Sequence, residues 1–457
     1  MQTKEQKNAV LTVSVITSFL TAFLGSSVNV ALPSIQKEYH IDAVTLAWIS
    51  TSYLLATASI LLPFGRLSDI MGRKKTFLWG LILFTTFSFL CAFAPNIYIL
   101  IALRIIQGVG AAMIFSASTA IITSVFPMGE RGRAMGYSVS AVYLGLTLGP
   151  VLGGILTQNF GWRSIFLLNL PIGIFIVYLV QKKLGNVEWA DSRGERFDWS
   201  GTILYISGLS FLMLGFTRIQ TYFGKTLLIA SIIILILFII IENKLEQPII
   251  SVKIFLKNIT FMLSNLAALI NYSTTFAVSF LLSLYLQYIK GLTPQNAGFV
   301  LAIQPITQAI FSSYAGKLSD RFEPRYVASF GMLLSSLGIF LLSFINSNTS
   351  LYFLILAQVL LGLGFAFFSS PNTNAIMSSV EKKYYGVASA LVGTMRLVGQ
   401  TFSLGVVTML FAIYLGGSKF SPPLYPTFIS LTHWILLGFS IVSAFGILAS
   451  LARGNIK

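Results

Sequence analysis

Residues 98–125 read YILIALRIIQGVGAAMIFSASTAIITSV, and these 28 residues hold one ionised side chain, that of Arg104. The run is long enough to cross a bilayer, which takes about 20 apolar residues. A guanidinium stays charged at any ordinary pH, and moving it into hydrocarbon costs at least about 2.5 kcal/mol. A chain that keeps such a group inside an apolar segment is expected to use it for structure or for transport.

The overall composition extends this interpretation to the whole chain. Of its 457 residues, 55% are hydrophobic and 10% are charged, and the mean hydropathy is +0.82. Because soluble globular proteins carry about 25% charged residues, the composition predicts a polytopic membrane protein. The net charge of +16 does not indicate a nucleic-acid partner, since the basic residues are scattered between apolar stretches.

Apolar windows recur along the chain and predict fourteen transmembrane segments. Their approximate limits are 9–31, 45–65, 76–94, 98–125, 134–157, 164–181, 201–217, 226–241, 260–287, 296–316, 327–346, 351–378, 386–415 and 430–452. Backbone groups in lipid must pair with one another, either within a helix or between the strands of a closed barrel, and these windows do not alternate as barrel strands do. The predicted fold class is therefore an all-α polytopic membrane protein, embedded in a lipid bilayer and without a soluble domain.

Basic residues are distributed unevenly between the two sides of this arrangement. Of 30 Lys and Arg residues, 22 lie in the termini and in the loops after even-numbered segments, and 6 lie in the other loops. The positive-inside rule therefore predicts that both termini are cytoplasmic. The remaining two, Arg104 and Arg396, lie within segments.

The two halves of the chain also resemble each other. GRLSD at 65–69 recurs as GKLSD at 316–320, and glycines repeat at an offset of 254 residues, which relates Gly108 to Gly362, Gly110 to Gly364 and Gly145 to Gly399. Parallel six-helix repeats with a substrate site between them are typical of transporters, although duplication for packing alone is an alternative. We expect a six-helix bundle at 1–182, a cytoplasmic loop with two inserted helices at 183–258, and a second six-helix bundle at 259–457.

The predicted loop after the second segment reads GRLSDIMGRKKT at 65–76. Its glycines permit tight turns at the membrane surface. The carboxylate of Asp69 is expected to accept hydrogen bonds from a nearby helix N-terminus or from Arg73. A basic anchoring loop is the simpler alternative.

The fifth segment ends in GLTLGPVLGG at 145–154. Gly145, Gly149 and Gly153 are four residues apart, so they share one helix face that another backbone can approach closely. Pro150 removes a helix hydrogen bond and bends the axis. Together with Gly154, these residues are predicted to form a conformational seam between two states, with ordinary close packing as the alternative.

These motifs together resemble those of the major facilitator superfamily, specifically its fourteen-span drug:proton antiporter branch. The loop GRLSDIMGRKK, the arginine-containing LIALRIIQGVGAA at 100–112 and the glycine-rich GLTLGPVLGG resemble three of the family's motifs. VNVALP at 28–33, WRSIFLLNLPIG at 162–173 and FDWSG at 197–201 also resemble features of the family or of this branch. The resemblance implies a major facilitator fold, made of two six-helix bundles plus two inserted helices, that exchanges small-molecule substrates for protons by alternating access.

One position departs from that branch. Its first helix usually carries an aspartate nine residues before the proline of its motif, and here that position is Leu24. At about 1.5 Å per residue, Leu24 and Arg104 lie at similar depth, so the usual carboxylate partner is missing. All 14 Asp and Glu residues fall in loops or at segment ends. We therefore expect neutral or anionic compounds to be handled at least as well as monovalent cations.

Candidate transport residues follow from polarity within the segments. Arg104, Arg396, Asp69 and Arg73 are the candidates for transport and coupling, and Arg396 lies near mid-depth. The candidates for a substrate cavity are polar side chains on the expected cavity helices: Asn29, Gln107, Tyr285, Gln304, Gln308, Asn372 and Asn374. Such amides serve equally well as hydrogen bonds between helices.

The predicted function is export of amphipathic small molecules by a secondary active transporter, a monomer in the plasma membrane of a prokaryote, with protons as the counter-transported ion. The alternative is an exporter or facilitator of one metabolite without proton coupling, and a non-transporting membrane receptor is a third possibility. The chain has no GxxxxGK[ST] loop to power primary transport. No catalytic residue, cofactor or metal site is expected.

Overall fold

The computed structural model describes residues 4–184, 187–190, 192, 194–245, 248–249, 258–380, 385–416 and 421–454. Over these residues the chain folds into long α-helices joined by short loops. The helices are α1 (Lys4–Tyr39), α2 (Ala43–Met71), α3 (Arg73–Cys91), α4 (Ile97–Val125), α5 (Met128–Phe160), α6 (Arg163–Leu184), α7 (Trp199–Thr217), α8 (Tyr222–Glu242), α10 (Ile259–Leu284), α11 (Pro294–Arg321), α12 (Pro324–Ser343), α13 (Leu351–Ser378), α14 (Tyr385–Tyr414) and α15 (Tyr425–Ala452), with a π turn η1 (Tyr285–Ile289) and a 3-10 turn η3 (Pro422–Leu424).

Each of the fourteen predicted apolar windows coincides with one of these helices. Among the described residues, twelve helices are long and apolar enough to cross a membrane. The other two are α3, which begins with the basic triplet at 73–75, and α11, which carries several polar side chains. The prediction of an all-helical, multi-pass membrane protein is confirmed, and a count of fourteen spans stays a prediction.

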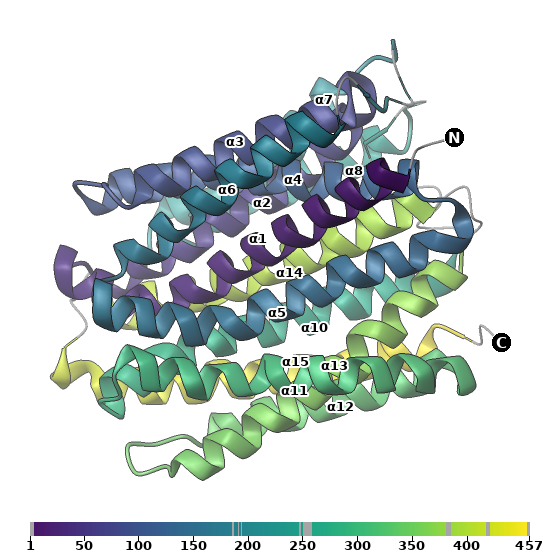
Figure 1. Ribbon diagram of the computed structural model, residues 1–457. Coiled ribbons are helices and arrows are strands. Elements are labelled where there is room, and N and C mark those ends of the chain that lie inside the picture. Colours follow the sequence, from purple (N-terminus) through teal and green to yellow (C-terminus); the bar gives the residue numbers. More distant parts are fainter. Residues whose placement is uncertain are drawn as a thin grey trace.

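Both chain termini lie at the same end of the bundle, which we call the termini end, and the other is the opposite end (Figure 1). Odd-numbered predicted segments therefore run away from the termini end and even-numbered ones return to it. This arrangement agrees with an even number of long helices. The assignment of the termini end to the cytoplasm stays a prediction from the charge distribution.

The helices pack into two groups, which we call the N half (α1–α6) and the C half (α10–α15). In the N half α1 packs on α5, and α4 packs on α2 and α3; in the C half α10 packs on α14, and α13 packs on α11 and α12. The halves meet along two seams, α5 with α11 and α2 with α14, while α7 pairs with α8 and contacts both α2 and α14. The boundaries at 182 and 258 stay predictions, and residues 250–257 lie outside the described residues.

Glycines related by the internal repeat occupy equivalent places in the two halves. A Cβ atom at Gly108 on α4 would lie 2.5 Å from a backbone oxygen of α2, and one at Gly362 on α13 would lie 2.5 Å from a backbone oxygen of α11. In the same way, Gly145 on α5 lies against the backbone of α1, and Gly399 on α14 lies against that of α10. Any side chain would push these helix pairs apart. The sequence repeat therefore corresponds to a repeat of helix-to-helix contacts.

Candidate functional site

Arg104 lies inside the N half with 1% of its surface exposed. Its Nε donates to the carbonyl oxygen of Ile49 on α2 at 3.2 Å, and its Nη1 donates to Oε1 of Gln107 at 2.6 Å. The guanidinium carbon lies 4.2 Å from the centre of the Tyr53 ring, a distance at which the ring face attracts a cation. Neutral acceptors and a ring therefore surround Arg104, and it does not snorkel to the surface.

Leu24, where the branch carries an aspartate, is fully buried in the N-half core. Its apolar side chain cannot accept a hydrogen bond, so neutral acceptors and the Tyr53 ring take the place of a carboxylate around Arg104. Sequence reasoning missed the Ile49 acceptor because a carbonyl on a neighbouring helix has no signature in residue type. Tyr53, which lies one turn along α2 from Ile49, could have been identified from the sequence.

Arg396 lies between the two halves and is half-buried. It is eleven residues from the start of α14, which places it about 16 Å along the helix at 1.5 Å per residue. Its guanidinium carbon lies 5.9 Å from the ring centre of Phe115, which belongs to α4 in the N half. The two arginines therefore occupy different environments, one within a half and one at the junction.

Aromatic and hydroxyl side chains from both halves gather around Arg396. The hydroxyl of Tyr143 on α5 lies 3.5 Å from Oγ of Ser369 on α13. The hydroxyl of Tyr272 on α10 interacts with Ser369 and with the charge of Arg396. We call Phe115, Tyr143, Tyr272, Ser369 and Arg396 the central cluster. All five are half-buried, so they are partly accessible at the junction of the halves.

Two of the predicted cavity residues are used for packing near the opposite end. Oδ1 of Asn29 accepts from Oγ of Ser50 at 3.1 Å, and its backbone oxygen accepts from Oγ of Ser283 in the C half at 2.7 Å. The hydroxyl of Tyr285 donates to the backbone oxygen of Asn346 at 2.6 Å. Both side chains are buried, so neither is open to a substrate in this conformation.

The predicted cavity asparagines of α13 bond within the C half. Oδ1 of Asn372 accepts from Nη1 of Arg453 at 2.6 Å, and its Nδ2 donates to the backbone oxygen of Ser264 at 3.1 Å. Asn374 donates to Oγ of Ser319 at 3.2 Å. Arg453 follows the last helix and is fully buried, and this burial lowers the pKa of its guanidinium to about 10. These contacts hold the termini ends of the C-half helices together.

The glutamines of α11 differ from these asparagines. Within the described part of the chain, the side chains of Gln304 and Gln308 form no hydrogen bond with the protein. Gln304 is half-buried and Gln308 is 6% exposed. Of the predicted cavity residues, Gln304 therefore keeps an accessible amide group for a ligand, whereas the amide of Gln308 is buried in this conformation.

The halves are closed against each other at the opposite end. Nε2 of Gln287 donates to the backbone oxygen of Val30 at 2.9 Å, and the hydroxyl of Tyr288 donates to Oε1 of Gln36. Both donors lie in the π turn η1, which follows α10 and places these two side chains against α1. Together with the Ser283 contact, they tie the C half to the N half at this end.

The glycine-rich end of α5 contributes to the same closure. A Cβ atom at Gly153 would lie 2.5 Å from Cβ of Ser27 on α1, and one at Gly154 would lie 2.5 Å from the backbone oxygen of Pro294 on α11. Gly145 and Gly149 also face α1, and Gly298 on α11 lies against the backbone oxygen of Pro150. The predicted seam therefore packs on two sides, against α1 of its own half and against α11 of the other half.

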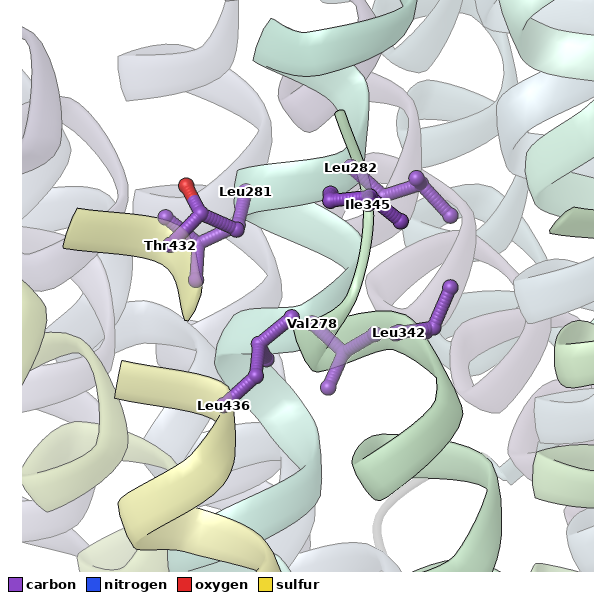
Figure 2. Close-up of a pocket in the computed structure, with 7 residues that line it drawn as sticks. All are labelled: Val278, Leu281, Leu282, Leu342, Ile345, Thr432 and Leu436. Carbon is purple, nitrogen blue, oxygen red and sulfur yellow. The ribbon is translucent and has the colours of Figure 1, made fainter. Parts of the chain in front are cut away.

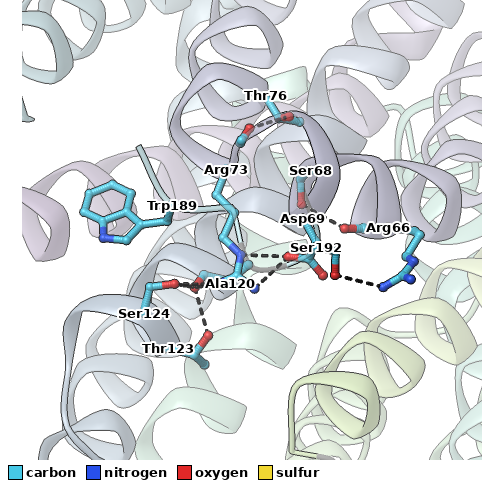
Figure 3. A network of polar contacts seen from close by, with 12 residues as sticks. Arg66, Ser68, Asp69, Arg73, Thr76, Ala120, Thr123, Ser124, Trp189 and Ser192 are labelled. Atoms are coloured by element: carbon cyan, nitrogen blue, oxygen red, sulfur yellow. Dashed lines mark hydrogen bonds and ion pairs between the residues drawn. The ribbon is translucent and has the colours of Figure 1, made fainter. Parts of the chain in front are cut away.

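The prediction of a loop at 65–76 is wrong, because α2 and α3 extend into this segment and leave only Gly72 between them. A network of polar contacts holds this junction, which we call the α2–α3 loop (Figure 3). Asp69 pairs with Arg73 at 2.7 Å, which is one of the two partners that the spacing predicts. Arg73 also donates to Oγ of Ser124 on α4, and the backbone N–H of Ser192 donates to the backbone oxygen of Asp69 at 3.1 Å. The side chain of Asp320, the repeat equivalent of Asp69, lies outside the described residues.

The linker between α6 and α7 docks onto this loop, which the sequence did not predict. The carboxylate of Glu188 accepts from the backbone N–H groups of Lys74 at 2.8 Å and Lys75 at 3.1 Å. It thereby caps the first turn of α3, where N–H groups lack partners within the helix. The backbone oxygen of Trp189 accepts from the N–H of Arg73 at 2.8 Å. The linker therefore acts as part of the N half.

Replacing Glu188 by alanine is expected to lower the free energy of unfolding by about 1 kcal/mol, because a lost helix cap costs about that much. Chemical unfolding of the purified protein would measure it. The matched control is Glu5→Ala, since the exposed Glu5 carboxylate pairs with Lys183 at 2.6 Å, caps no helix among the described residues, and should leave stability unchanged. Equal losses in both variants would contradict a capping role for Glu188.

Two further features of the described residues can mark a site, an apolar gap in the C half and groups of metal-ligating side chains. Figure 2 shows an apolar gap between α10, α12 and α15 that leaves no room for a water molecule; it is lined by Val278, Leu281, Leu282, Leu342, Ile345, Thr432 and Leu436. It lies within the C half, so it is a packing gap. Within the described ranges, no group of three or more His, Cys, Asp or Glu side chains is placed to hold a metal ion.

Comparisons with known proteins agree with this architecture. The family model of the Major Facilitator Superfamily matches residues 14–245 and 265–455. The chain is 33% identical to the riboflavin transporter RibZ of Clostridioides difficile, over 88% of this chain and 87% of that protein. It is 31% identical to the multidrug resistance protein Stp of Mycobacterium tuberculosis, over 88% of this chain and 74% of that protein.

Solved structures show the same fold at lower sequence identity. A bacterial homolog of the human lysosomal transporter Spinster, inward-facing and unoccupied, has a TM-score of 0.69 at 15% identity, over 99% of this chain and 97% of that chain. A peptide transporter, POT, in complex with sulfate has a TM-score of 0.70 at 14% identity, over 95% and 93%. The fold is therefore that of membrane transporters, although these identities carry no information on substrate.

Proposed function

Since the chain belongs to the Major Facilitator Superfamily, we propose that it exports amphipathic small molecules from the cell by proton antiport with alternating access. The observation that carries the proposal is the central cluster, where half-buried side chains of both halves meet around Arg396. A site shared by two halves changes its access when the halves rock. The chain is a transporter of this superfamily, not an enzyme, and it lies in the plasma membrane.

The glycine seam supports the alternating-access part of the proposal. On α5, Gly153 and Gly154 let the backbone approach α1 and α11 at once. Closure at the opposite end is supported by these close backbone contacts and by the hydrogen bonds of Ser283, Gln287 and Tyr288. The residues proposed for transport and coupling are Arg104, Arg396, Asp69 and Arg73.

Export of one specific metabolite is the second candidate. The relative at 33% identity is a riboflavin transporter, while the relative at 31% is a multidrug resistance protein. Sequence similarity therefore favours neither a broad nor a narrow range of substrates. The two candidates differ in a competition assay, because a multidrug exporter is inhibited by chemically unrelated compounds and a metabolite exporter is inhibited only by close analogues.

Proton coupling is tested in everted membrane vesicles that carry an imposed inward-acidic pH gradient. Addition of a transported compound is expected to dissipate the gradient, because each cycle exchanges substrate for protons. The readout is the recovery of a fluorescent pH probe, with vesicles lacking the protein as the control. Transport that continues unchanged after both the pH gradient and the membrane potential are collapsed would exclude antiport and favour a facilitator.

A further inference from the structure

Arg396 differs from two other buried or half-buried arginines, Arg104 and Arg453, in having no hydrogen-bond or ion-pair partner among the described residues. Arg104 donates two hydrogen bonds and Arg453 donates three. Within the residues that the structure describes, the Arg396 guanidinium donates no hydrogen bond and pairs with no carboxylate. A guanidinium carries five N–H donors and cannot lose its charge. The donors of Arg396 are therefore available to an acceptor that the protein does not supply.

The walls around this charge are aromatic and come from both halves. Phe115 lies 5.9 Å from the guanidinium carbon, and Tyr272 interacts with its charge. The ring of Tyr272 lies 6.1 Å, centre to centre, from that of Phe365 on α13. Flat rings on opposite sides of an interface favour a flat, apolar ligand body. The hydroxyls of Tyr143 and Ser369 add polar contacts at one edge.

The charge is also absent from the equivalent place in the repeat. At the offset of 254 residues, Phe115 corresponds to Ser369, and both belong to the central cluster. The same offset takes Arg396 to Val142 on α5, an apolar side chain. A residue needed only to pack the repeated fold would have a counterpart of similar size and polarity. The single positive charge is therefore a property of this binding region and not of the duplicated scaffold.

The sign of the charge selects the ligand. A cation brought beside Arg396 would be repelled in a region of low dielectric, whereas a carboxylate, sulfonate or phosphate would form charge-assisted hydrogen bonds. None of the 14 acidic residues lies near mid-depth in a helix to attract a cation instead. Planar aromatic anions match both the aromatic side chains and the positive charge of Arg396.

We propose that Arg396 anchors the anionic group of a planar aromatic substrate at the junction of the halves. The proposal rests on the proposed export function and names its substrate class. The flat ring system lies between Phe115 and Tyr272, and the anionic group accepts from the guanidinium. Arg104, which is buried inside the N half and donates to Ile49 and Gln107, takes no part in this contact.

Dye binding to the purified full-length protein tests this directly. An anionic fluorescein and a cationic rhodamine ester share the same flat ring system and differ in charge, and fluorescence anisotropy gives the dissociation constant of each. Arg396→Gln is expected to weaken fluorescein binding at least about tenfold, because a hydrogen bond to a charged group is lost. Binding of the rhodamine ester should be unchanged or tighter, and Arg396→Lys should keep most of the fluorescein affinity.

The matched control is Arg325→Gln, which removes the same charge from α12, where the guanidinium lies 4.6 Å from the Tyr326 ring, away from the central cluster. Equal weakening of both dyes by Arg396→Gln would show a structural role and overturn the proposal, as would unchanged fluorescein binding. Export of the rhodamine ester alone from everted vesicles would overturn the anion proposal and leave export standing. Wild-type protein that neither binds nor moves either dye would overturn both.

Discussion

Replacing Arg104 by alanine is expected to reduce transport at least about a hundredfold, while the protein still inserts into the membrane. The substitution removes the hydrogen bonds to Ile49 and Gln107 and the contact with the Tyr53 ring. Hydrogen bonds to charged groups contribute about 1.5–3 kcal/mol each, and about 1.4 kcal/mol corresponds to tenfold. Transport in vesicles, normalised to the amount of inserted protein, measures the effect.

Two further variants separate the charge of Arg104 from its shape. Arg104→Lys keeps the charge but loses the planar fork that reaches two acceptors at once, so it should restore little activity. Arg133→Ala removes an exposed arginine from α5 and should leave transport unchanged. Full activity of Arg104→Lys would show that charge alone suffices, and full activity of Arg104→Ala would show that transport does not need this residue.

Replacing Gly154 by leucine is expected to reduce transport about tenfold or more by preventing closure at the opposite end. The new side chain would meet the backbone of Pro294 on α11, since even a Cβ atom would lie 2.5 Å from its carbonyl oxygen. Overpacking costs about 1–3 kcal/mol, which is enough to shift the closed population about tenfold. Gly136 lies on the same helix with nothing within 4 Å of a Cβ atom, so Gly136→Leu is the matched control.

Thiol labelling reports the conformation of the Gly154 variant independently of transport. Cys91 is the only cysteine of the chain and it is buried, so it contributes little background. A cysteine placed at Ser283, which is fully buried beside Asn29, should react slowly in the wild-type background and faster with Gly154→Leu. If Gly154→Leu blocks transport without faster labelling, the seam does not act through closure at this end.

The helices were predictable because their signals are local. Each apolar window became a helix, and the offset of 254 residues corresponds to matched glycine contacts in the two halves. The Asp69–Arg73 pair was also predictable, because an acid and a base four residues apart in a short polar segment lie close together even though Gly72 separates them onto two helices. The docking of the linker was not, because Glu188 reaches α3 across more than a hundred residues and its partners are backbone N–H groups.

The roles of single polar residues were the least predictable part. Asn372 and Gln304 both appear as amides within apolar segments, yet the first bonds to Arg453 while the second has no bonded partner among the described residues. The two arginines likewise differ only in their surroundings, since Arg104 is enclosed by one half and Arg396 faces both. Burial and partner choice depend on the neighbouring helices, which the residue type does not reveal.

The placement of α7 makes the two sides of the molecule unequal toward the surrounding lipid. The hydroxyl of Tyr205 donates to the backbone oxygen of Ala58 on α2 at 3.2 Å, and the ring of Phe216 lies 5.7 Å from that of Phe402 on α14. Through α7, the inserted pair thus packs against the seam between α2 and α14, whereas among the described residues neither of its helices packs on α5 or α11. We expect a lipophilic molecule dissolved in the bilayer to meet the inserted pair on the side of α2 and α14, and to meet α5 and α11 directly on the other side. Entry of a lipophilic molecule from the bilayer is therefore expected to favour the side of α5 and α11.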